Sequence, residues 1–150
     1  MDKHSKTNAT EIILSERVRH TFYAFATAMY NWEKEFYRER LEALDDNGCR
    51  SALLEQGHAD LSTIFSAYVT KKGKNYDRLK NLVCGANPEY EINGKTVKIS
   101  VTRKNTATVI FEKNSGSFES YRLNFTEIHG VLKIQRRSLN DEGKWLSVHV

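Results

Sequence analysis

The sequence predicts an α+β fold in which N-terminal helices pack on one face of a mainly antiparallel sheet. Apolar residues recur at helical spacing through about the first 70 residues, and from Thr96 onward they alternate with a period of two, as in strands. Helices followed by a run of strands with short connections are typical of this class. The chain has 150 residues, so we expect one domain over residues 1–150, with a flexible tail at residues 1–9.

A long first helix is expected over residues 10–44. Large apolar residues, spaced by alternating steps of four and three, define its buried face: Val18, Phe22, Phe25, Met29, Trp32 and Phe36. A helix of this length spans about 50 Å, so we expect it to project beyond the domain or to bend at one end. Glu33 and Glu35 flank the apolar stripe, and we interpret both as solvated carboxylates.

A second helical region is expected over residues 50–70, because turn residues at 45–48 end the first helix. Four residues are expected to form its apolar face: Leu61, Ile64, Phe65 and Tyr68. Gly57 is a candidate break within this helix. A basic loop, KKGKNYDRLK, follows at residues 71–80, and Pro88 then favours an extended backbone that leads into the first strand.

The rest of the chain predicts an antiparallel meander. Strand patterns occupy residues 97–101, 107–111, 121–125, 131–138 and 144–150, with turns expected at residues 114–116, 129–130 and 140–143. Arg136 shares its parity with Leu132 and Ile134, so simple alternation points it toward the core side, with its guanidinium at the rim. Arg137 has the opposite parity and is expected on the solvent side.

Charge is distributed unevenly along the chain. The formal net charge is +4, with 8 Lys/Arg against 11 Asp/Glu in residues 1–70 and 15 against 8 in residues 71–150. A basic half can contact nucleic acid or an acidic protein, or it can belong to solvated strand edges, where lysines discourage aggregation. The strands show no aromatic pair on an evidently exposed face of the kind that stacks bases, so we expect no nucleic-acid partner.

The sequence contains no recognisable catalytic or metal-binding pattern. It has no CxxC or HExxH motif, none of its five histidines is visibly paired with an inward carboxylate, and inward strand positions are aliphatic or aromatic. We therefore expect no enzymatic activity, no metal and no cofactor. The apolar run at residues 12–14 is too short for a membrane span or a signal peptide, and two cysteines form no disulfide framework. These features favour a cytoplasmic protein without a membrane partner.

Four segments resemble the NTF2-fold immunity proteins of bacterial polymorphic toxin systems, within the NTF2-like superfamily. They are NWEKEFY at residues 31–37, IFSAYVTKKGKNYDRL at 64–79, GANPEYE at 85–91 and DEGKW at 141–145. Together they span nearly the whole chain in the expected order. The chain departs from the family at Leu132, where a tryptophan is expected, and in being basic, since immunity proteins against nucleases are commonly acidic.

The resemblance implies a cone, with the N-terminal helices in the concave face of a curved sheet. It also implies an immunity protein used in bacterial competition, which binds the C-terminal domain of a cognate toxin and neutralises it by protein–protein contact. Domains of this fold often dimerise through the sheet, so the resemblance is also consistent with a homodimer.

Arginine, tyrosine and tryptophan dominate interface hot spots, and we expect the partner surface to draw on such residues. The candidates are Tyr76, Arg78, Arg103, Lys104, Arg136, Arg137 and Trp145. The alternative is an NTF2-like pocket protein, either an enzyme or a ligand sensor, with a small molecule bound in the cone.

Overall fold

The computed structural model describes residues 9–44, 46–82, 84–113 and 119–150. Three sequence expectations concern residues outside these ranges: most of the N-terminal tail, position 45 of the turn between the helices, and the turn at residues 114–116.

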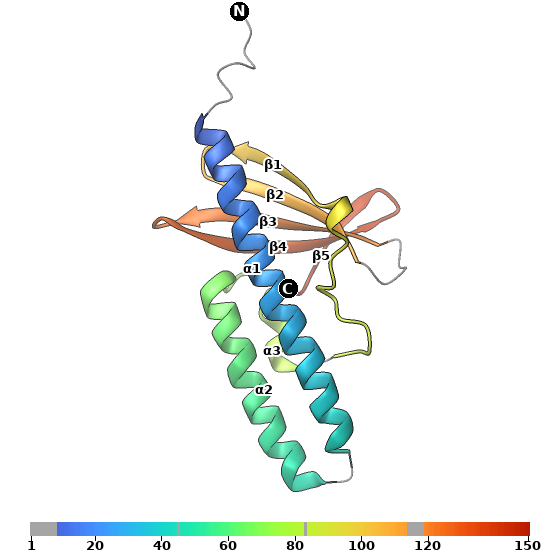
Figure 1. Cartoon of the computed structure of the whole chain (residues 1–150). Helices are drawn as coiled ribbons and strands as arrows, with labels where there is room; N and C mark the ends of the chain where they lie inside the picture. The colour runs from blue at the N-terminus through green and yellow to red at the C-terminus, as the bar shows by residue number, and fades with distance from the viewer. Residues whose placement is uncertain (1–8, 45, 83, 114–118) are drawn as a thin grey trace, which may run out of the picture.

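A five-stranded antiparallel sheet forms the C-terminal half of the fold, with its strands neighbouring one another in sequence order (Figure 1). The strands are β1 (Lys98–Arg103), β2 (Thr106–Glu112), β3 (Ser120–Ile128), β4 (Val131–Asp141) and β5 (Lys144–Val148). The two turns flanking β4 each contain two residues with positive φ, His129 and Gly130 before it and Glu142 and Gly143 after it. Such turns match the natural twist of antiparallel strands. The predicted meander is confirmed.

The helices precede the sheet and cover one of its faces. They are α1 (Ala9–Glu42), α2 (Asn47–Tyr68) and the short α3 (Asp77–Lys80), followed by the 3₁₀ turn η2 (Gly94–Thr96). Figure 1 shows the N-terminal half of α1 crossing the sheet and its C-terminal half extending beyond it, where α2 lies alongside. The long helix therefore projects, as its length predicts. None of the described helices is both long and apolar enough to cross a bilayer.

The predicted apolar stripe of α1 is buried along its whole length. Over the sheet, the ring of Phe22 lies 5.3 Å from that of Phe111, measured between centroids. Beyond the sheet, Trp32 stacks on Phe36 at 5.0 Å and faces α2. One stripe thus joins the sheet layer to the helix pair, and the α+β fold class with helices on a curved antiparallel sheet is confirmed.

Gly57 does not break the second helix, which runs without interruption from Asn47 to Tyr68. A Cβ atom at this position would lie 2.5 Å from Cε2 of Phe36, and the Gly57 carbonyl accepts a hydrogen bond from Trp32 Nε1 at 3.0 Å. The missing side chain therefore lets α2 approach the aromatic pair on α1.

The first prediction concerns this close approach. Replacing Gly57→Ala should lower the free energy of unfolding by about 1–3 kcal/mol, because the methyl group overpacks the Phe36 ring. Urea unfolding monitored by tryptophan fluorescence measures the change. In a Phe36→Leu background this penalty should disappear, so Gly57→Ala should be neutral or stabilising by up to about 1 kcal/mol. With Phe36 in place, a stabilised Gly57→Ala protein, gaining the roughly 1 kcal/mol helix preference of alanine, would contradict the packing argument.

Candidate functional site

A β-bulge in β4 determines how the arginine pair is placed. Asn124 of β3 pairs with Arg136, whereas the next residue of β3 pairs with Ile134, so Gln135 is the inserted residue. An inserted residue reverses the alternation of the side chains that follow it. Arg137 is consequently buried, with 1% of its surface exposed, and Arg136 is exposed. The sequence-based orientation of both arginines is therefore wrong, because simple alternation assumes an unbroken ladder.

The bulge is held by the loop that follows α2. The side-chain nitrogen Nδ2 of Asn75 donates hydrogen bonds to the backbone oxygens of Gln135 at 2.8 Å and Thr70 at 2.9 Å. The backbone N–H of Thr70 also donates to the carbonyl of Ile134 at 2.9 Å. Asn75 is 2% exposed, so its amide is a fixed link between loop and strand.

On the core side of the sheet, Arg137 joins a group of buried charges. Its Nη1 donates to Glu89 Oε2 at 3.1 Å and to the backbone oxygen of His149 at 3.2 Å. Its guanidinium also lies over the rings of Tyr121 and Tyr90, at 4.1 and 5.2 Å from their centroids. Cationic groups are attracted to aromatic faces, so the rings supply further stabilisation to this buried charge.

The same carboxylate connects Arg137 to a second arginine. Nη1 of Arg78 lies 3.4 Å from Glu89 Oε2, and Nη2 of Arg78 is paired with Glu33 Oε1. We call Glu33, Arg78, Glu89 and Arg137 the ion network. Its two carboxylates and two guanidinium groups balance in formal charge, and it connects α1, α3, the segment before β1, and β4.

Glu33 is 1% exposed, so its interpretation as a solvated carboxylate is wrong. Its Oε2 accepts a hydrogen bond from the backbone N–H of Tyr90 at 3.2 Å. The missed signal is positional, because Glu33 lies four residues after Met29 and three before Phe36, both of which are buried. Helical spacing alone places it beside these residues, and the partner that makes burial tolerable, Arg78, is 45 residues away in sequence.

The surroundings hold the ionisable groups of this region in definite charge states. Burial alone would raise the pKa of Glu89, but its hydrogen bond with His149 and the charges of Arg137 and Arg78 outweigh that effect and hold the pKa well below its usual range. Burial likewise disfavours the charge of Arg78, yet Glu33 and Glu89 raise the pKa of Arg78 above its ordinary value. Burial raises the pKa of the neighbouring Cys84 thiol to about 11. A weakly basic carboxylate and a protonated thiol suit a structural network better than proton transfer or nucleophilic attack.

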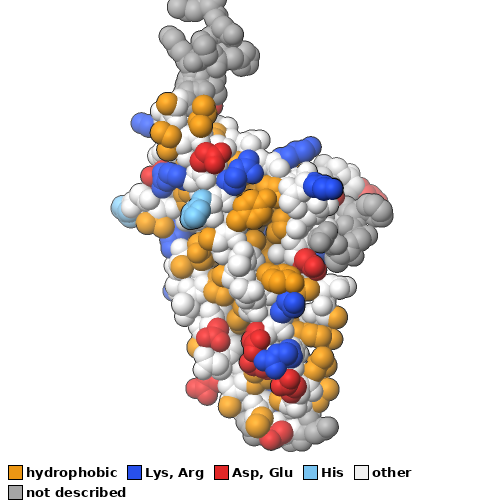
Figure 2. Space-filling model, in the orientation of Figure 1, with side chains coloured by type: hydrophobic (Ala, Val, Ile, Leu, Met, Phe, Trp, Pro, Cys, Tyr) orange, Lys and Arg blue, Asp and Glu red, His pale blue; other side chains and the backbone are white. Residues whose placement is uncertain are grey.

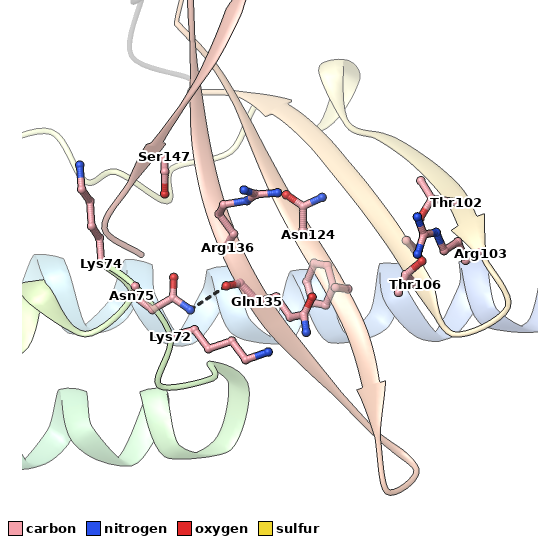
Figure 3. Close-up of a pocket in the computed structure, with 13 residues that line it drawn as sticks. Lys72, Lys74, Asn75, Thr102, Arg103, Thr106, Asn124, Gln135, Arg136 and Ser147 are labelled. Atoms are coloured by element: carbon pink, nitrogen blue, oxygen red, sulfur yellow. Dashed lines mark hydrogen bonds between the residues drawn. The ribbon is translucent and has the colours of Figure 1, made fainter.

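On the opposite face of the sheet, which we call the outer face, Arg136 lines a cavity of about 610 Å³ (Figure 3). The cavity extends from the loop at residues 72–75 across β4 and β3 to the turn between β1 and β2. Four cationic side chains line it, namely Lys72, Lys74, Arg103 and Arg136. We call it the outer-face cavity.

The structure separates the seven predicted contact residues into three groups. Arg103 and Arg136 both line the outer-face cavity, and Lys104 is exposed beside it in the β1–β2 turn. Two others are half-buried: Trp145 lies under the guanidinium of Arg122 at 4.6 Å, and Tyr76 donates from its hydroxyl to the carbonyl of Val69 at 3.1 Å. The remaining two, Arg78 and Arg137, belong to the ion network and offer almost no free surface.

The groove between α1 and α2 has a different character from the outer-face cavity. Its lining includes Glu35, Glu39 and Asp60 together with a single cation, Lys34. Figure 2 shows the mixed charges over the helix pair in the lower half of that view. Within the described ranges, no group of three or more His, Cys, Asp or Glu side chains could hold a metal ion.

The second prediction tests the ion network. Glu33→Gln removes the charge that faces Arg78 and should lower the free energy of unfolding by about 3 kcal/mol, because it leaves a buried guanidinium partly unpaired. The matched control is Glu35→Gln on the exposed face of α1, where we expect little change in stability because solvent screens the charge. Equal effects of the two substitutions in chemical denaturation would contradict a stabilising network.

The third prediction is a pH dependence. The pKa of Glu89 is lower in the folded state than in the unfolded state, so its contribution to stability is present above the unfolded value of about 4.3 and is lost as the pH falls toward the folded pKa. Wild-type stability should decrease as the pH falls from about 5 to about 2, whereas Glu89→Gln should be less stable at pH 6 and less sensitive to acid. Glu55→Gln, an exposed change on α2, should keep the wild-type profile; the same profile for Glu89→Gln would refute this assignment.

The sequence and the fold are both similar to known proteins. Residues 17–148 match the family model described as NTF2 fold immunity protein, a span that runs from the first half of α1 to the last residue of β5. A solved structure of a protein of unknown function from Bacteroides thetaiotaomicron VPI-5482 is similar at 14% identity and a TM-score of 0.33, with 84% of this chain and 98% of that chain covered. The search of curated proteins finds no match.

Proposed function

Because the chain belongs to the family of NTF2 fold immunity proteins, we propose that it binds one cognate bacterial toxin domain and neutralises it by direct protein–protein contact. The observation that carries this proposal is the family match itself, which includes the ion network and all five strands. In this proposal the protein acts in the cytoplasm, where it meets the C-terminal domain of the toxin.

The filled interior of the cone supports a function on the surface. The rings of Phe22, Tyr90 and Phe111 occupy the space between α1 and the sheet, and each is at most 2% exposed. A small-molecule enzyme or sensor of this fold would use that space for its ligand. The structure therefore gives no specific support to the pocket-protein alternative.

The charge states near the ion network also support a binding protein. Glu89 has a depressed pKa and Cys84 a raised one, so neither group is tuned for exchange of protons near neutral pH.

A binder that protects a cell must form a complex that outlasts delivery of the toxin. We expect a Kd of about 1 nM or tighter, consistent with an interface of roughly 1,600 Å² in total.

The fourth prediction is growth rescue. Bacteria expressing the toxin C-terminal domain encoded by the gene immediately upstream should stop growing, and co-expression of this chain should restore growth because the complex blocks the toxin. Pull-down and calorimetry should then show a complex with a Kd of about 1 nM. The control is a toxin domain from an unrelated system, against which this chain should give no protection. Killing that continues unchanged in the presence of this chain would contradict the proposal.

A further inference from the structure

We infer that the outer-face cavity is the surface that receives the toxin, and that the part of the toxin seated there is a segment rich in aspartate and glutamate. This inference rests on the proposed function and adds to it the contact face and the charge of the partner. Four features of the cavity lead to it: its charge, its unmet hydrogen-bonding groups, its fixed wall and the chemistry of its neutral lining.

The charge of the cavity is not balanced from within. Lys72, Lys74, Arg103 and Arg136 line it, and none of the described lining residues carries a carboxylate. Across the described part of the chain, none of the four lies within ion-pairing distance of an acidic side chain, whereas Arg17, Arg38, Arg78 and Arg137 all do. Unbalanced charge of one sign in a concave surface attracts and concentrates partners of the opposite sign.

A fifth cation strengthens this field. Arg122 pairs across the sheet with Ser138, and Asn124 pairs with Arg136, so the two arginines are diagonal neighbours on the outer face. Burial lowers the pKa of Arg122, and the nearby charge of Arg136 lowers it further. A carboxylate placed between these arginines would relieve this repulsion.

Among the described residues, two buried polar atoms at or beside the cavity lack hydrogen-bond partners. They are Oδ1 of Asn124, which lines the cavity, and Nε of the adjacent Arg122. A buried polar atom without a partner costs about 1–3 kcal/mol, so a bound segment that reached either atom after a small side-chain shift would recover part of that cost. A peptide segment carries backbone N–H donors that suit the Asn124 oxygen and carboxylate acceptors that suit the Arg122 N–H group.

One wall of the cavity is set before any partner arrives. Asn75 ties the loop at residues 72–75 to the bulge in β4, and Figure 3 shows its hydrogen bond to Gln135 between the side chains of Lys72 and Arg136. The same bulge directs Arg136 into the cavity. A backbone wall that is already held in place loses less entropy on binding, which favours a tight complex.

The neutral lining distinguishes an acidic protein segment from nucleic acid. It consists largely of amide and hydroxyl side chains: Asn75, Thr102, Thr106, Asn124, Gln135 and Ser147. Its single aromatic residue, Phe125, is 1% exposed, so the lining offers no ring for base stacking. A volume of 610 Å³ is also ample for several residues of a peptide, whereas an isolated carboxylate or phosphate fills only a small part of it.

The fifth prediction uses two charge-matched double variants. Lys74→Glu with Arg136→Glu reverses two cations of the cavity, and Arg19→Glu with Lys95→Glu reverses two exposed cations outside it. Both variants change the net charge equally. Binding to the toxin domain used for growth rescue should weaken at least about 100-fold in the cavity variant and less than about threefold in the control. All four sites are exposed, so circular dichroism and thermal unfolding should show both variants folded.

The outcomes separate this inference from the proposed function. If wild-type protein and both variants bind and rescue equally, the toxin docks elsewhere: the immunity function stands and the cavity assignment falls. Equal losses in both variants indicate a general charge effect and also overturn the assignment.

A labelled oligonucleotide that binds the wild type but not the cavity variant, with toxin binding unaffected, would assign the cavity to nucleic acid instead. A change in oligomeric state confined to the cavity variant, by light scattering, would assign it to a homodimer. Failure of wild-type protein to bind or rescue overturns both proposals.

Discussion

The inserted residue in β4 is the constraint on which both sides of the sheet depend. At Gln135 the ladder with β3 slips by one residue, so that Arg136 and Arg137 exchange the faces that simple alternation assigns to them. Asn75 holds the slipped backbone through its hydrogen bond to the Gln135 carbonyl. One bulge thereby sends one arginine into a buried network and the other onto an open, basic surface.

The buried side of this arrangement serves the fold. Three of the four charged side chains are buried and Glu89 is partly exposed. Taking such charges out of water is costly, and the cost is offset only when each charge meets an opposite one at close range. Glu33 pairs with Arg78, and Glu89 pairs with Arg137. Arg137 also donates to the His149 carbonyl, so the network links α1 to the C-terminal end of the described chain. A network of this kind favours one arrangement of helices on the sheet.

Sequence periodicity predicted the elements of the fold well, because helix and strand burial are local properties. The stripe of α1, the meander and the family resemblance all followed from spacing and order. The errors lie where tertiary contacts override the local pattern. The alternation of apolar residues does not reveal a β-bulge. The burial of Glu33 depends on an arginine 45 residues away in the sequence. The pattern also predicts a helix break at Gly57, whereas the structure shows that glycine is needed there because the ring of Phe36 packs against it. Alternation alone also does not predict that Arg103 and Arg136 line the same cavity, because this depends on the register of the sheet.

In our proposal the buried ion network and the partner surface lie on opposite faces of β4. Hydrogen–deuterium exchange of this chain, free and in complex with the toxin domain, distinguishes this arrangement from the alternatives. We expect slower exchange on binding at residues 72–76 and 102–106, which border the outer-face cavity, with little change at the tip of the α1–α2 pair. Slower exchange confined to the groove between α1 and α2, with none around the cavity, would contradict it.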